Sequence, residues 1–205
     1  MIEEDHYVYV KRSEWSFIIL SLYVDDILLA RNNKEFIKTI KKWLSSTFEM
    51  KDMVEASFVL GVKILRDHSR KLLGLFQETY IRKVLERFHM QDCKPIDTPV
   101  GNGDSLSSEM CPTTQAEIES MAQVPYANAI GNLMYEMLCT HSKICFTVRL
   151  VSRFQSNPRP AHWKAVKRIL WYLRGTADYM LCLQGRDLRL REYSEADWAG
   201  AQINL

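Results

Sequence analysis

The sequence has 205 residues, of which 47% are hydrophobic and 25% are charged. This balance excludes a disordered or collagen-like chain, because enough apolar side chains are present to build a buried core. The five cysteines are odd in number and form no C-x-x-C pair, which favours a reducing intracellular compartment over a disulfide scaffold.

Neither a membrane anchor nor a secretory signal is expected. The longest apolar run near the N-terminus, residues 17–24, is interrupted by Ser21 and is far shorter than the roughly 18 residues that a bilayer span requires. The first five residues include three acids, whereas a secretory signal begins with a basic region. We therefore expect a protein that is neither secreted nor bound to a membrane.

Charge is distributed unevenly along the chain. Residues 1–142 carry 16 Lys and Arg against 20 Asp and Glu, residues 143–191 carry 11 against 2, and residues 192–205 carry none against 3. The overall charge of +2 therefore conceals a basic block of net charge +9. Clustered basic residues are typical of proteins that bind a polyanion, but a solvated helix surface is an equally good explanation.

An antiparallel sheet and a helix are predicted near the N-terminus. Three segments are rich in the β-branched and aromatic residues that favour strands, namely residues 7–11, 17–24 and 27–30. Asn33 is a plausible N-cap for a helix that runs to about Phe48, because apolar residues recur there at helical spacing while lysines lie on the other face.

A second hairpin and a second helix are predicted before residue 91. Residues 57–65 and 72–76 have the composition of two strands, and apolar residues at helical spacing predict a helix over residues 80–88. Residues 91–125 contain four prolines and no sustained period, so this stretch is predicted to be a linker or wrapping loop. Because a long irregular stretch is unusual inside one compact domain, a domain boundary is expected within it.

The remainder of the chain is predicted to be mainly helical. Three segments show helical periodicity, namely residues 126–140, 145–155 and 161–174. Gly175 then provides a C-cap signal. Two candidate strands, residues 179–183 and 188–193, close the chain as the start of a new hairpin.

Two adjacent acids, Asp25 and Asp26, fall between two apolar strand candidates. Ionised acids are costly to bury unless they are paired or bound to a metal, but at a β-turn both carboxylates can face one accessible rim. Mg²⁺ is bound in this way, together with substrate phosphates, in enzymes of phosphoryl and nucleotidyl transfer. An ordinary Asp-Asp hairpin turn is the alternative, since Asp is common in turns.

The sequence around this pair resembles the catalytic hairpin of reverse transcriptases, through Tyr23-Val24-Asp25-Asp26-Ile27-Leu28-Leu29-Ala30. Its surroundings are similar to the copia-type long-terminal-repeat retrotransposon Pol polyprotein. The other matching segments are Phe58–Ile64, Gln77–Ile81, Cys93–Pro95, Thr98-Pro99, Tyr126, Ala129–Tyr135, Val151–Phe154, Asn157-Pro158, His162-Trp163, Tyr172–Thr176 and Tyr193–Gly200. Together they cover essentially the whole chain, and their shared order and spacing make the resemblance specific.

The resemblance implies an α+β fold. A partial right-hand polymerase palm, with an antiparallel sheet and helices, would be followed by a helical thumb and the first hairpin of a ribonuclease H-like domain. The implied divisions are 1–90 for the C-terminal part of the palm, 91–125 for the linker or wrapping loop, 126–177 for the thumb-like region and 178–205 for the start of a truncated ribonuclease H-like domain.

The resemblance also implies RNA-directed DNA synthesis by two-Mg²⁺ nucleotidyl transfer. The partners would be a primer–template duplex of RNA and DNA, together with deoxynucleotides, in a cytoplasmic particle or the nucleus. Asp25 and Asp26 would be the catalytic metal ligands, and Tyr23 would lie near the primer terminus.

Further residues would contact nucleic acid by the same resemblance. Leu60 and Gly61 fall in a primer-gripping hairpin, although a strand with a bulge-prone glycine is the alternative. Gly131 and Tyr135 lie four apart on one helix face and would meet the duplex minor groove, although glycine also permits helix packing. The residues expected to contact phosphates are Lys164, Lys167 and Arg168.

Departures from the family pattern limit the expected activity. The third essential carboxylate of the family lies in a strand well upstream, and the sequence begins only 24 residues before Asp25. Because a two-metal site needs its ligands together, we expect a fragment without polymerase activity of its own. Glu195 stands where the pattern has the first metal-binding Asp of ribonuclease H, so that activity is not predicted. The alternative function is a non-catalytic remnant whose basic helical block grips a primer–template duplex.

Overall fold

The computed structural model describes residues 5–13, 16–101, 106 and 114–185. The chain divides into two compact units, Met1–Ala56 and Ser57–Leu205. This division falls at a different place from the boundary expected within residues 91–125. The polyprotein domain divisions implied by the resemblance stay predictions.

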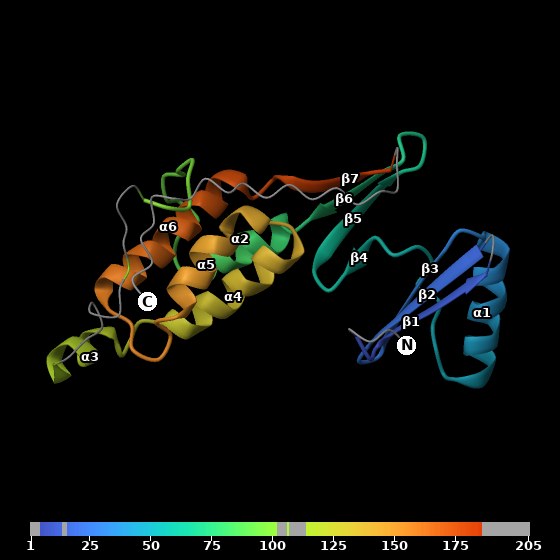
Figure 1. Ribbon diagram of the computed structural model, residues 1–205, viewed down its shortest axis with the longest axis horizontal. Coiled ribbons are helices and arrows are strands. Elements are labelled where there is room, and N and C mark those ends of the chain that lie inside the picture. The colour runs from blue at the N-terminus through green and yellow to red at the C-terminus, as the bar shows by residue number, and fades with distance from the viewer. Residues whose placement is uncertain (1–4, 14–15, 102–105, 107–113, 186–205) are drawn as a thin grey trace. The chain divides into compact units, whose positions relative to one another are not determined.

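The first unit is a three-stranded antiparallel sheet with one helix along it (Figure 1). Its elements are β1 (Val8–Ser13), β2 (Ser16–Tyr23), β3 (Asp26–Arg31) and α1 (Lys34–Thr47). The predicted strands and helix are confirmed. Asn33 caps α1 as expected, because its Oδ1 accepts from the backbone N–H groups of Glu35 and Phe36 at 3.0 and 3.4 Å.

One face of this sheet packs against α1. Along β3, Ile27, Leu29 and Arg31 are partly buried while the residues between them are exposed. The Arg31 guanidinium lies 3.6 Å from the centroid of the Phe36 ring on α1, at cation–π distance. The opposite face of the sheet is not covered by α1, and no described residue between 5 and 56 is fully buried.

The second unit contains a four-stranded antiparallel sheet in the order β4-β5-β6-β7. These strands are β4 (Phe58–Val59), β5 (Val62–Asp67), β6 (Leu72–Phe76) and β7 (Met180–Gln184). The prediction of one strand over residues 57–65 is wrong, because a two-residue turn at Leu60 and Gly61 divides it. The predicted strand at 179–183 exists, and its described partner is β6, with Leu181 opposite Leu75. Residues 188–193 lie outside the described residues.

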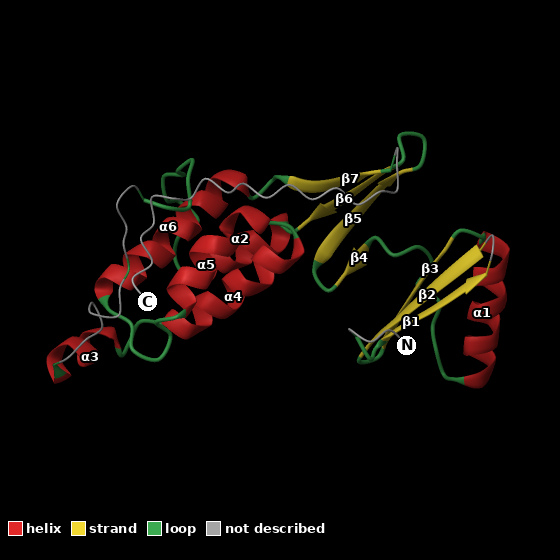
Figure 2. Ribbon diagram, in the orientation of Figure 1, coloured by secondary structure: helices red, strands yellow, loops and turns green. Residues whose placement is uncertain are grey.

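A helical core accompanies this sheet (Figure 2). The helices that share it are α2 (Glu78–Arg87), α4 (Tyr126–Cys139), α5 (Cys145–Ser152) and α6 (Pro160–Thr176), with a short 3₁₀ turn, η2 (Ser142–Ile144), between α4 and α5. Their fully buried side chains include Ile81, Leu85, Ile130, Leu133, Val148, Ile169 and Leu170. Burial of each such side chain contributes about 1.5–3 kcal/mol. Thus α2, which precedes residue 91, shares one core with the helices that lie between residues 126 and 177.

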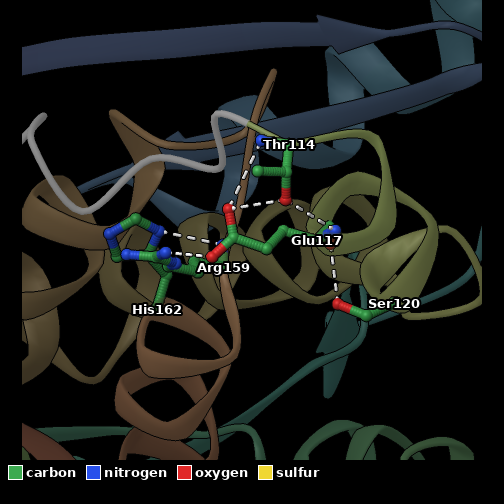
Figure 3. Close-up of polar contacts among 5 residues, drawn as sticks. All are labelled: Thr114, Glu117, Ser120, Arg159 and His162. Atoms are coloured by element: carbon green, nitrogen blue, oxygen red, sulfur yellow. Dashed lines mark hydrogen bonds and ion pairs between the residues drawn. The ribbon is translucent and has the colours of Figure 1, made fainter.

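The prediction of an irregular stretch over residues 91–125 is wrong at its C-terminal end, where α3 (Gln115–Met121) forms. Thr114 and Glu117 make a reciprocal capping box at the start of this helix. Glu117 also forms an ion pair with Arg159, at the N-terminus of α6 (Figure 3). The backbone N–H of Arg159 donates to Nδ1 of His162 at 3.1 Å, so His162 helps to cap α6.

The first part of the predicted loop runs along α6. The backbone N–H of Ile96 donates to the Trp171 carbonyl at 3.4 Å, and the Arg174 side chain donates to the Gln91 carbonyl at 2.7 Å. Gly175 lies inside α6 rather than at its C-cap, so that prediction is wrong. A Cβ atom on Gly175 would lie only 3.0 Å from Cβ of Pro95, so close packing explains the glycine. Among the described helices, none is long and apolar enough to cross a membrane.

Candidate active-site hairpin and nucleic-acid interface

The acidic pair lies at the tip of the β2–β3 hairpin. The two strands pair up to Tyr23 opposite Asp26, so Val24 and Asp25 form a two-residue turn. Asp25 therefore belongs to the turn itself, and Asp26 is the first residue of β3. The two strands pair regularly from Ile18 opposite Arg31 to Tyr23 opposite Asp26, so the turn lies at the end of the hairpin. Both carboxylates are therefore accessible to solvent.

Val24 is in an unfavourable backbone conformation. Its φ angle is +50°, and its side chain is 88% exposed. A positive φ at the first turn position is typical of a type II′ turn, where glycine is usual and a β-branched residue is a genuine outlier. Such strain costs about 1–3 kcal/mol and is concentrated at functional sites. The turn is therefore a stronger candidate site than an ordinary Asp-Asp turn.

The hairpin register determines which groups share a face. Tyr23 and Asp26 are cross-strand partners, so their side chains point to the same side of the sheet. That side is opposite to the one on which Ile27 and Leu29 pack against α1. Tyr23 is 56% exposed. The open face of the hairpin thus presents a phenol and a carboxylate, with Asp25 beside them in the turn.

Asp25 and Asp26 are both exposed, and neither carboxylate has a hydrogen-bond or ion-pair partner among the described residues. Their oxygens are therefore free to ligate, and carboxylate oxygens are the ligands that Mg²⁺ prefers. Within the described part of the chain, no group of three or more His, Cys, Asp or Glu could hold a metal ion. These two carboxylates fit a divalent cation as part of a ligand set.

A second turn joins β4 to β5 in the other unit. Val59 pairs with Val62, and both turn residues have positive φ angles, +50° for Leu60 and +79° for Gly61. Two positive φ angles are the signature of a type I′ turn, which suits the twist of a tight hairpin. The alternative of a bulged continuous strand is wrong. Leu60 is 48% exposed at the tip.

The expected minor-groove residues on α4 have different surroundings. Gly131 is exposed, and a Cβ atom built on it would meet nothing within 4 Å, so helix packing does not explain this glycine. Tyr135, one turn later, is partly buried, and its hydroxyl donates to the backbone carbonyl of Leu60. The structure therefore brings Leu60, Gly61 and Tyr135 together, with Gly131 on the open side of α4.

The three basic residues expected to contact phosphates also differ from one another. Lys164 is exposed on α6 and Lys167 is partly exposed. The guanidinium of Arg168 donates to Oγ1 of Thr98 at 3.1 Å, so it is engaged with the segment that runs along the helix. Lys164 is the most accessible of the three to a phosphate backbone.

Comparisons with known proteins show the family of the chain. Residues 1–102 match the family described as Reverse transcriptase (RNA-dependent DNA polymerase). Over 197 residues, or 96% of the chain, the sequence is 50% identical to the Retrovirus-related Pol polyprotein from transposon TNT 1-94 of Nicotiana tabacum. The chain belongs to the copia-type reverse transcriptase family.

Other relatives show how this reverse transcriptase segment relates to longer proteins. It is 32% identical over 197 residues to the Pol polyprotein from transposon RE2 of Arabidopsis thaliana. It is also 32% identical over 188 residues to an uncharacterized mitochondrial protein of Arabidopsis thaliana, and covers 72% of that protein. The chain spans 15% of the tobacco polyprotein and 13% of the RE2 polyprotein. No solved structure matches the chain.

One cluster in the reverse transcriptase segment was missed by the sequence analysis. Glu136 is fully buried on α4, and neither of its carboxylate oxygens has a hydrogen-bond partner in the described part of the chain. His141 Nδ1 lies 2.8 Å from Oγ1 of Thr140, and its Nε2 lies 3.2 Å from the Thr176 carbonyl. Oγ1 of Thr140 also lies 2.6 Å from Oε1 of Gln77. A buried polar cluster therefore connects the start of α2 with the C-terminal ends of α4 and α6.

Burial controls the charge of this cluster. It raises the pKa of Glu136 to about 8 and lowers the pKa of His141. Both groups are thus mainly neutral near pH 7. The available sequence signal was a glutamate in the apolar stripe of α4, between Leu133 and Met137, where a polar residue is unexpected.

Proposed function

We propose that the chain supplies the metal-binding hairpin and a duplex-gripping surface to a reverse transcriptase of a Pol polyprotein. The observation that carries this proposal is the strained Val24 turn, which leaves the carboxylates of Asp25 and Asp26 exposed and without partners among the described residues. The membership of the chain in the copia-type family supports RNA-directed DNA synthesis as the reaction.

In this proposal, the chain's own residues bind and orient. Asp25 and Asp26 contribute carboxylate oxygens to divalent cations, and Tyr23, on the same face as Asp26, lies beside the primer terminus. The cation is proposed to be Mg²⁺, which, when bound, would activate the primer 3′-hydroxyl and neutralise charge on the triphosphate. A rigid hairpin suits this role, because metal ligands must be held in place before the substrate arrives.

The second unit is proposed to hold the primer–template duplex. The turn at Leu60 and Gly61 would meet the primer strand, and the open helix face at Gly131 would let the α4 backbone approach the minor groove. Lys164 and Lys167 would contact phosphates, which position the duplex without reading its sequence. The net charge of +9 over residues 143–191 supports a polyanionic partner.

Polymerase activity is proposed to need a further carboxylate. The resemblance places the third essential acid of the family in a strand upstream of the hairpin, and a two-metal site functions only when its ligands are together. We therefore expect the 205-residue chain, by itself, to bind duplex without extending the primer. We also expect the protein to be intracellular, because a retrotransposon is copied inside the cell.

A second candidate is a non-catalytic nucleic-acid-binding remnant. The exposed Gly131 and the basic block over residues 143–191 support it, because contacts of these groups with a duplex would not depend on the carboxylates. The two candidates differ in what Asp25 does. Under the first, Asp25→Asn abolishes primer extension by a protein in which the chain is joined to an upstream palm segment. Under the second, the substitution has no effect on extension.

The first experiment measures duplex binding and primer extension by the full chain. The proposal predicts salt-sensitive binding to a primer–template duplex and no nucleotide incorporation with Mg²⁺. Absence of duplex binding by the folded chain would contradict both candidates. Incorporation by the chain alone would contradict the proposed need for a further carboxylate.

A further inference from the structure

Tyr135 of α4 holds the β4–β5 turn through its hydroxyl group. The hydroxyl donates to the backbone carbonyl of Leu60, a residue 75 positions earlier in the sequence. The same oxygen lies 3.8 Å from the position that a Cβ atom on Gly61 would occupy. The hydroxyl therefore lies against both residues of the turn. Leu60 has a positive φ of +50°, a conformation that a leucine rarely adopts without restraint from its surroundings.

The ring of Tyr135 is itself held from α2. Its centroid lies 4.8 Å from that of Tyr80, with the planes at 65°, which is the preferred edge-to-face arrangement. The Tyr80 hydroxyl donates to Oδ1 of Asn132 at 3.1 Å, and the Arg87 guanidinium donates to the same oxygen at 3.1 Å. Asn132 in turn donates to the Asn128 carbonyl at 2.6 Å. Contacts thus run without interruption from α2 through α4 to the turn.

The ring and the hydroxyl of Tyr135 are both engaged in contacts within the protein. Its ring packs against Tyr80, and its hydroxyl is occupied by the Leu60 carbonyl. A phenol is protonated at neutral pH, and burial raises the pKa of this one further, to about 12, so the hydroxyl remains a donor to the carbonyl. Gly131, one turn earlier on α4, faces open space instead.

We propose that Tyr135 is a positioning residue, which holds the Leu60–Gly61 turn in the conformation that meets the primer strand and does not contact the duplex itself. This inference rests on the proposed function for the role of the turn. The restraint on the turn, however, can be measured in the absence of nucleic acid. The restraint by Tyr135 and the proposed role of the turn in duplex binding can therefore be tested separately.

The test compares Tyr135→Phe with Tyr80→Phe in the full 205-residue chain. The first variant keeps the ring against Tyr80 and removes the hydroxyl, which bonds the Leu60 carbonyl and also interacts with the thiol of Cys139. The second is a matched control, because it removes a neighbouring hydroxyl bond and leaves the turn's own bond in place. Three quantities are measured: hydrogen exchange at the amides of residues 60–62 in the free protein, the thermal unfolding midpoint, and the dissociation constant for a primer–template duplex.

We expect Tyr135→Phe to speed exchange at the turn about five-fold and to weaken duplex binding by a similar factor, the effect of losing one hydrogen bond. The unfolding midpoint should fall by no more than about 2–4 °C, as expected for the loss of one hydrogen bond from a folded chain of this size. Tyr80→Phe should leave exchange at the turn unchanged. Unchanged exchange in Tyr135→Phe overturns the inference, and weaker duplex binding alongside it would identify Tyr135 as a contact residue. Wild-type chain that binds no duplex overturns the proposed function, while the exchange result still decides whether Tyr135 holds the turn.

Discussion

Glu136 lies 4.0 Å from Nδ1 of His141, and both side chains are buried. At this distance the two groups would form an ion pair if both were charged. Burial opposes that state, since it raises the pKa of Glu136 to about 8 and lowers the pKa of His141. The pair is therefore mainly neutral near pH 7, at a position that joins α2, α4 and α6.

This arrangement predicts that the second unit becomes less stable as the pH rises above 6.5. Glu136 has a higher pKa in the folded chain than its ordinary 4.5, so its contribution is present at low pH and is lost as the pH rises through about 8. The lowered pKa of His141 has the opposite effect on stability, because the unfolded chain binds a proton at this residue more readily than the folded chain does. This effect is confined to pH values below about 6.5. Between pH 6.5 and 8 the free energy of unfolding should fall by about 2 kcal/mol, which lowers the unfolding midpoint by about 4–8 °C.

The control for this prediction is Glu136→Gln, which has a similar shape and does not titrate. Its unfolding midpoint should be nearly constant between pH 6.5 and 8. The neighbouring Tyr80 and Cys139 do not interfere, because burial raises the pKa of each above its ordinary value. A wild-type midpoint that does not fall in this window, or a variant that falls equally, would contradict the assignment to Glu136.

A pair of glycine substitutions tests the open face of α4. Gly131→Ala should stabilise the helix by about 0.5–1 kcal/mol, because alanine is the better helix former and its Cβ meets nothing within 4 Å. The same substitution should weaken duplex binding if the backbone approaches the minor groove there. Thermal unfolding and duplex titration measure the two effects.

Gly175→Ala is the matched control inside another helix. Its Cβ would lie 3.0 Å from Cβ of Pro95, so the substitution should destabilise the chain despite the better helix propensity. Loss of stability in Gly131→Ala would mean that this glycine serves packing after all. If Gly131→Ala stabilises the chain and leaves its affinity for the duplex unchanged, Gly131 is not part of the duplex-binding surface.

Lys164→Ala should reduce the salt dependence of duplex binding. Removal of one phosphate contact lowers the slope of log K against log salt by about 0.9, equally for all duplex sequences. Arg168→Ala should act differently, since Arg168 donates to Thr98 and its loss loosens the segment along α6. Titrations at several salt concentrations distinguish the two, and an unchanged slope in Lys164→Ala would exclude a phosphate contact there.

Local sequence signals predicted much of the fold. β-Branched and aromatic residues were sufficient to predict the first hairpin, and apolar residues at helical spacing after the Asn33 cap were sufficient for α1. The same reasoning missed the turn after Val59, because Leu60 is an unusual residue at a position with positive φ and reads as part of a strand. It also missed α3, although Thr114 followed three residues later by Glu117 is a readable capping box.

The rest of the fold depends on contacts between distant residues. No local pattern specifies that β7 pairs with β6, or that the Tyr135 hydroxyl meets the Leu60 carbonyl. The candidate metal ligands were found because Asp25 and Asp26 are adjacent in the sequence, whereas the cluster of Glu136 and His141 forms only when helix ends come together in space.

Primer extension shows whether Asp25 is a metal ligand of the polymerase site. The chain is joined to the palm segment that precedes the matching region in a copia-type polyprotein, and Mg²⁺-dependent incorporation of deoxynucleotides is measured with and without Asp25→Asn. Ser69→Ala, a substitution in the exposed β5–β6 turn, is the control. We predict incorporation by the wild-type and control proteins and loss of at least about a hundred-fold in Asp25→Asn, as expected when a metal ligand is removed. Incorporation that persists at the wild-type rate in Asp25→Asn would contradict the role of Asp25 as a metal ligand.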